Sequence, residues 1–110
     1  RIAESVPYFE RANELKPNDA AFLSNLGNSL YQLGQSERAL KYFDAAIKAQ
    51  PDLSAAHSNR GAALYTLERY KEAVESLRRA LAFDPDSAEA NNNLGVILSR
   101  VGKKKEALKY

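Results

Sequence analysis

Residues 20–53 read AAFLSNLGNSLYQLGQSERALKYFDAAIKAQPDL, and residues 54–87 read SAAHSNRGAALYTLERYKEAVESLRRALAFDPDS. The two stretches are equal in length and superpose without a gap. Glycines and prolines recur with the same 34-residue spacing along the chain, at Gly27, Gly61 and Gly95 and at Pro17, Pro51 and Pro85. The sequence is therefore a tandem array of one short unit, and its fold is that unit stacked on its neighbours.

Each unit contains two apolar stripes with helical spacing. In residues 20–53 the stripes are Phe22, Leu23, Leu26, Leu30 and Leu33, followed by Ala39, Leu40, Phe43, Ala46 and Ile47. Gly34 and Gln35 separate them, which predicts a tight turn between two antiparallel helices. We expect Ser36 to be the N-cap of the second helix and Pro51 to end it.

The repeat spacing also predicts how the chain is organised. We expect one all-α domain over residues 1–110, a right-handed α-solenoid of antiparallel helix pairs. It has two complete repeats flanked by partial ones: residues 1–19 as the second helix of a preceding repeat, 20–53, 54–87, and 88–110 as a truncated repeat. After each repeat proline comes a residue expected to cap the next helix: Asn18, Asp52 and Asp86.

The order of these residues resembles the tetratricopeptide repeat (TPR), whose 34-residue pattern is W-x₂-L-G-x₂-Y, then A-x₃-F, then P. The first complete repeat aligns with it at Leu23, Leu26, Gly27, Leu30, Ala39, Phe43 and Pro51, the second at His57, Arg60, Gly61, Leu64, Ala73, Leu77 and Pro85, and the third at Asn91, Leu94, Gly95, Leu98 and Ala107. The departures are modest: the Trp position holds Leu23, His57 and Asn91, and Arg60 replaces a packing leucine, which predicts a looser second hairpin. The resemblance covers the chain and implies a protein-binding module without catalytic activity.

One face of the first helices is small, polar and almost uncharged. It carries an asparagine two residues before each repeat glycine, at Asn25, Asn59 and Asn93, which we call the asparagine ladder. The predicted groove consists of Ser24, Asn25, Asn28, Tyr31, Ser58, Asn59, Tyr65, Asn92, Asn93 and Arg100. Because an amide both donates and accepts hydrogen bonds, such a ladder is suited to the backbone of an extended peptide. Similar ladders line the groove of the TPR domain of the O-linked N-acetylglucosamine transferase.

Three other interpretations of these surfaces stay open. The asparagines could instead hydrogen-bond within their own hairpins. A second TPR binding mode, the carboxylate clamp for chaperone C-termini, matches Asn28 and Asn59, but its basic positions fall on Ser24, Glu89 and Asn93. Alternatively, the chain is an assembly module that associates head to tail, with residues 1–17 of one copy docking on the last hairpin of the next.

Composition argues against other functions. Eighteen Ala and fourteen Leu, against three Ile, four Val and one Thr, favour helices over strands. With His57 as the sole histidine and no cysteine, no catalytic residues, metal site or cofactor are expected. The net charge of +2 and the absence of a long apolar run predict neither a nucleic-acid nor a membrane partner. The lack of cysteine fits the cytoplasm.

Overall fold

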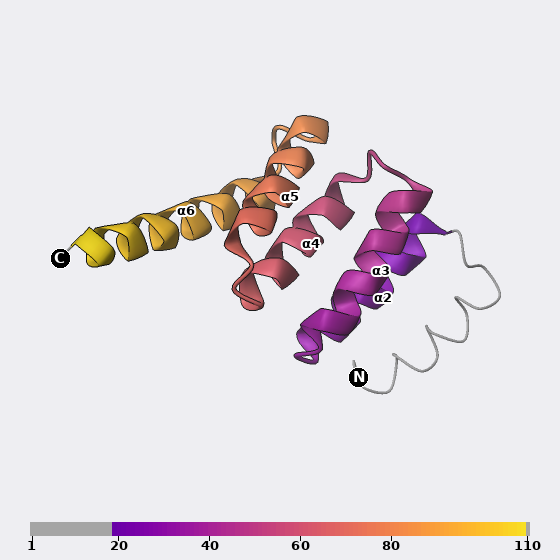
Figure 1. Ribbon diagram of the computed structural model, residues 1–110. Helices are drawn as coiled ribbons and strands as arrows, with labels where there is room; N and C mark the ends of the chain where they lie inside the picture. The colour runs from indigo at the N-terminus through magenta and orange to yellow at the C-terminus, as the bar shows by residue number, and fades with distance from the viewer. Residues whose placement is uncertain (1–18, 110) are drawn as a thin grey trace.

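The computed structural model describes residues 19–109, and of residues 103–109 only the helical backbone. This part of the chain contains five α-helices and no strand: α2 (Ala20–Gln32), α3 (Ser36–Ala49), α4 (Ser54–Thr66), α5 (Tyr70–Phe83) and α6 (Ala88–Lys109). Figure 1 shows them as a row of hairpins, with α2 against α3, α4 against α5, and α6 extending from α5. The all-α repeat solenoid predicted from the sequence is confirmed, and both complete hairpins lie where the spacing places them.

Both hairpins turn through the same backbone motif. The second residue after the end of the first helix is left-handed in each hairpin, Gly34 with φ 80° and Glu68 with φ 60°. The next amide then reaches back into the helix: Gln35 N donates to Leu30 O at 2.9 Å, and Arg69 N donates to Leu64 O at 2.9 Å. These bonds satisfy carbonyls at the helix end and reverse the chain within three residues.

The N-caps lie one residue later than predicted. Asp19 accepts from Phe22 N at 3.1 Å, and the Ser87 hydroxyl accepts from Ala90 N at 3.2 Å. The equivalent N-cap of α4 is Leu53, which has no capping side chain. Asp52 and Asp86 therefore do not cap, because the chain enters each helix only after a full turn beyond the proline; Asn18 lies outside the described residues.

Ser36 is also not the N-cap that the sequence predicts. Gln35 occupies that position without a side-chain cap, and Ser36 is the first residue of α3. The Ser36 hydroxyl is buried and has no hydrogen-bond partner. The three-residue turn explains the shift, because it brings the chain to α3 already in helical conformation.

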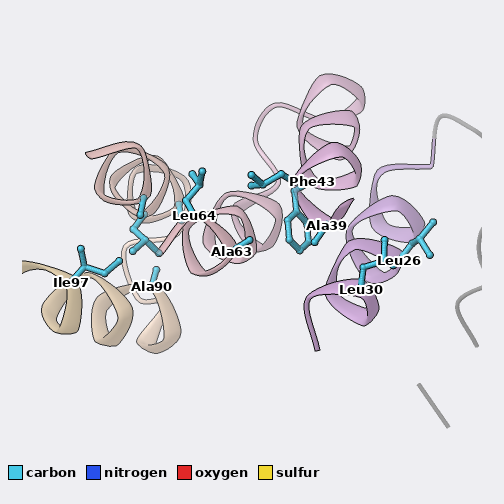
Figure 2. Close-up of a cluster of buried hydrophobic side chains, with 12 residues drawn as sticks. Leu26, Leu30, Ala39, Phe43, Ala63, Leu64, Ala90 and Ile97 are labelled. Carbon is cyan, nitrogen blue, oxygen red and sulfur yellow. The ribbon is translucent and has the colours of Figure 1, made fainter. Parts of the chain in front are cut away.

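One apolar core cluster runs from α2 to α6, and Figure 2 shows its side chains from Leu26 to Ile97. The largest of these side chains are fully buried. Two glycines allow the paired helices to approach closely. A Cβ placed on Gly27 would lie 2.6 Å from Phe43 Cε1, and one on Gly61 would lie 2.7 Å from Leu77 Cγ. The helices therefore meet where the repeat pattern puts glycine opposite a large apolar residue.

The third repeat departs from this pattern. Gly102 is the register equivalent of Gly34 and Glu68, so the sequence predicts a turn here and a second helix after it. In the structure α6 instead continues through Gly102 to Lys109. Continuation of α6 satisfies the backbone hydrogen bonds of residues 103–109 within one helix.

Candidate peptide-binding face

Helices α2, α4 and α6 are the first helices of successive repeats and lie next to one another in the solenoid. We call their shared polar surface the groove face. It is defined by the residues at six equivalent positions: Ala21, Ser24, Asn25, Asn28, Tyr31 and Gln32 on α2; Ala55, Ser58, Asn59, Ala62, Tyr65 and Thr66 on α4; and Glu89, Asn92, Asn93, Val96, Ser99 and Arg100 on α6.

The asparagine ladder contributes one contact between neighbouring helices. Asn59 Nδ2 on α4 donates to Ser24 Oγ on α2 at 3.5 Å, the long limit for a hydrogen bond. Asn25 is exposed, whereas Asn59 and Asn93 are half-buried. The Asn59 carbonyl and its second amide hydrogen are not used by this bond, so the ladder keeps hydrogen-bonding capacity for a ligand.

A second row of contacts follows one edge of the groove face. The Thr66 hydroxyl on α4 lies 3.4 Å from the Tyr31 hydroxyl on α2. One repeat further, Arg100 Cζ on α6 lies 5.9 Å from the centre of the Tyr65 ring on α4, within the range of a cation–π contact. The position of Tyr31 and Tyr65 therefore contacts the position of Thr66 and Arg100 at both junctions, α2 with α4 and α4 with α6. Thr66 and Arg100 are 34 residues apart and so share one register position on the face that the asparagine spacing defines.

Most of the predicted groove residues reach the surface, but two do not. Asn25, Asn92 and Arg100 are exposed, and Asn28, Tyr31, Asn59, Tyr65 and Asn93 are half-buried. Ser24 and Ser58 are only 4% and 2% exposed, so they lie in the packing between helices and not on an accessible face. The Ser58 hydroxyl has no hydrogen-bond partner. The structure thus brings eight of the ten residues to the accessible groove face.

Charge is sparse on the groove face. Only Glu89 and Arg100, both on α6, carry a charge among its residues. An ion pair that shifts a pKa lies outside this face, at the start of α5. There Arg69 donates hydrogen bonds of 3.1 and 2.7 Å to the Glu72 carboxylate. These hydrogen bonds, reinforced by the charge of Arg69, hold the pKa of Glu72 below its usual value.

His57 occupies a structural position. It is 3% exposed, its Nε2 lies 2.8 Å from Pro51 O, and its ring stacks on Phe83 with centroids 5.5 Å apart. Among the side chains that the structure describes, no group of three or more potential ligands is arranged to hold a metal ion. No helix in the same range combines the length and apolarity that crossing a bilayer requires.

An apolar hollow lies between α5 and α6, and none of the ladder asparagines lines it. It encloses about 500 Å³ and is lined largely by Tyr70, Val74, Leu98 and Val101, with Lys71 and Arg78 among the charged residues around it. Leu98 is 45% exposed, whereas its equivalents Leu30 and Leu64 are fully buried. In the complete repeats the second helix covers this leucine, and α6 lacks such a cover among the described residues.

Comparison with known proteins identifies the family. The tetratricopeptide repeat model matches residues 1–54, 24–88 and 58–110, so the chain belongs to this family. No match was found among curated protein sequences.

Solved structures agree in fold. The first TPR of Spaghetti (RPAP3), bound to the HSP90 peptide SRMEEVD, is 23% identical with a TM-score of 0.88, and the match covers 92% of this chain and 80% of that one. The Sgt2 TPR domain from Aspergillus fumigatus is 20% identical with a TM-score of 0.90, covering 96% and 71%. The second TPR domain of human RPAP3, in complex with the HSP70 peptide SGPTIEEVD, is 22% identical with a TM-score of 0.83, covering 87% and 80%.

Proposed function

We propose that this chain is a non-catalytic protein-interaction module of the cytoplasm that binds an extended peptide segment of a partner protein across α2, α4 and α6. The observation that carries the proposal is the repetition of one amide at one register position on three neighbouring helices, on a face with little charge. Support also comes from the similar TPR structures whose ligands are peptides. The same sparse charge disfavours nucleic acid as the partner.

The spacing of the ladder suits an extended chain. Packed helices lie roughly 8–10 Å apart, and an extended strand rises about 3.3 Å per residue. Successive asparagines therefore meet the peptide about every third residue, and each can pair with a backbone N–H and C=O. Because ordering the peptide costs several kcal/mol and the face offers no deep aromatic pocket, we expect an affinity on the order of micromolar.

The ligand of this groove differs from the chaperone tails that the two RPAP3 structures hold. Those peptides end in EEVD, and a terminal carboxylate needs basic partners. The positions that would supply them carry Ser24, Glu89 and Asn93, and Ser24 is buried. We therefore expect an internal segment to bind in preference to a free C-terminus.

The test is a peptide-array screen followed by titration of the best peptides. Asn59→Ala should weaken binding severalfold, and replacement of Asn25, Asn59 and Asn93 together should abolish it. Asn91→Ala is the matched control, because Asn91 lies on α6 outside the groove face and bonds to Ser87 O at 3.1 Å. If the triple variant binds within about twofold of the wild type, a difference of less than about 0.5 kcal/mol, the ladder does not bind peptide backbone.

Head-to-tail self-association is the second candidate, and the exposure of Leu98 favours it. In the complete repeats a second helix buries the equivalent leucine, and a second copy of the chain could supply one. The proposed docking segment, residues 1–17, lies outside the described residues. Sedimentation over a hundredfold concentration range tests it: association should appear for the wild type and disappear for Leu98→Asp. A mass fixed at 12.2 kDa throughout would exclude it.

A further inference from the structure

We propose that Arg100 and Tyr65 form a subsite for an aspartate or glutamate side chain of the bound peptide, at the edge of the groove face. The inference rests on the proposed peptide-binding function and adds a specificity to it. The asparagine ladder would bind the peptide backbone, which is the same in every sequence, so selectivity among peptides must come from the groups beside the ladder. Arg100 is the one cation among the groove-face residues.

The Arg100 guanidinium is available to a ligand. Three other arginines of the described region pair with carboxylates: Arg60 with Asp44, Arg69 with Glu72 and Arg79 with Glu75, each at 2.7 Å. Arg100 is exposed, and its guanidinium lies over the face of the Tyr65 ring, with no carboxylate paired to it among the side chains of residues 19–102. A cation–π contact leaves the N–H groups at the edge of the guanidinium free to donate.

The tyrosine ring holds this cation in place. Tyr65 is half-buried and packs against Tyr70, with ring centroids 5.7 Å apart. Because the ring is fixed by packing within the α4–α5 hairpin, the guanidinium above it loses less freedom when a carboxylate binds. A planar guanidinium group whose orientation is already fixed is suited to donating two parallel hydrogen bonds to a carboxylate.

Glu89 gives the groove face an electrostatic direction. It lies eleven residues before Arg100 on α6, a separation of about 16 Å along the helix axis. A peptide that crosses α6 near Asn93 therefore has the negative charge of Glu89 on one side and the positive charge of Arg100 on the other. Side chains of an extended peptide alternate between the two edges, so an acidic residue is favoured toward Arg100 and repelled on the other side.

The experiment uses a library of peptides with acetylated N-termini and amidated C-termini, so that carboxylates come from side chains alone. The wild type is compared with Arg100→Gln and with Arg78→Gln, which removes the same charge from α5 away from the groove face. Peptides selected by the wild type should be enriched in Asp or Glu at one position. That enrichment should vanish with Arg100→Gln and persist with Arg78→Gln.

A double-mutant cycle then measures the pair directly. With the best acidic peptide, Arg100→Gln should lower affinity about three- to tenfold, the range of a charge-assisted hydrogen bond on a partly exposed surface. When the acidic residue of the peptide is replaced by its amide, wild type and Arg100→Gln should bind equally. Tyr65→Leu should reduce the acidic preference, and the melting temperature of each variant shows that the fold is retained.

The failures are distinguishable. If peptides bind but show no acidic preference, or if the preference survives Arg100→Gln, the Arg100 subsite is refuted while peptide binding stands. If the wild type binds no peptide at all, the proposed function fails, and this subsite fails with it.

Discussion

Two glycines at the same register position should respond oppositely to alanine. An ideal Cβ on Gly61 would lie 2.7 and 2.9 Å from two atoms of the Leu77 side chain and 3.3 Å from the carbonyl oxygen of Ala73. A Cβ on Gly95 would meet nothing within 4 Å. Both residues lie in helices, so each alanine gains about 0.5–1 kcal/mol from helix propensity, and only Gly61→Ala must also displace its neighbours.

The magnitude follows from the atoms in contact. Leu77 Cγ is the branch point of a fully buried side chain, and the Ala73 oxygen belongs to the backbone, so neither moves away by a simple rotation. Overpacking of this kind costs about 1–3 kcal/mol. We therefore expect Gly95→Ala to stabilise the chain by about 0.5–1 kcal/mol, and Gly61→Ala to be less stable than Gly95→Ala by about 1–3 kcal/mol.

Urea and thermal unfolding, followed by far-ultraviolet circular dichroism, measure the difference. At roughly 4 °C per kcal/mol for a domain of this size, the two melting temperatures should differ by about 4–12 °C. Equal changes in the free energy of unfolding for the two variants would refute the close helix contact at Gly61. A destabilised Gly95→Ala would show that this position is packed in solution, as it would be against a second copy.

Two further predictions concern the hairpin turns. Glu68→Gly should raise the free energy of unfolding in urea by about 0.5–1 kcal/mol, because glycine adopts this left-handed backbone conformation without the steric strain of a Cβ atom. Gly34→Ala should lower it by a similar amount for the same reason. The opposite order would show that the turn differs in solution. Glu72→Gln should remove a stabilisation that depends on pH. The pKa of this carboxyl is lowered in the folded state by Arg69, so its contribution is present above about pH 4.3 and disappears as the pH falls through the lowered value. A stability difference between wild type and Glu72→Gln that persists unchanged in acid would contradict this pairing.

The helices could be predicted from the sequence because two independent signals coincide. Apolar periodicity defines each helix, and the repeat glycines and prolines fix where hairpins begin and end. The predicted second helix ending before Pro51 is observed to end at Ala49. What periodicity does not encode is the path between helices, and the cap at Asp19 in place of Asn18 depends on how the backbone turns after the proline.

Deviations from the repeat pattern were harder to interpret from the sequence. Arg60 occupies a position where the first repeat has the buried Leu26, which predicts looser packing. In the structure its guanidinium instead reaches Asp44 on α3 and Ser76 on α5, so a polar contact joins three helices where an apolar one would be expected. Such a contact depends on partners distant in sequence, and no spacing within the repeat signals it.

On the groove face, too, the sequence predicts which residues share a face of a helix but not which of them are buried. Helical spacing gives the angular position of a residue around its helix axis, and it places Ser24 beside Asn25. Burial, however, depends on the neighbouring helix, and α4 approaches closely enough for Asn59 to contact Ser24. The residue one step further around the helix, Asn25, stays exposed. At the next junction the exposed residue is Arg100, whose guanidinium lies over the Tyr65 ring. The proposed selectivity for peptides therefore rests on exposed residues of this face that differ from repeat to repeat, whereas the buried Ser24 and Ser58 lie in the packing between helices.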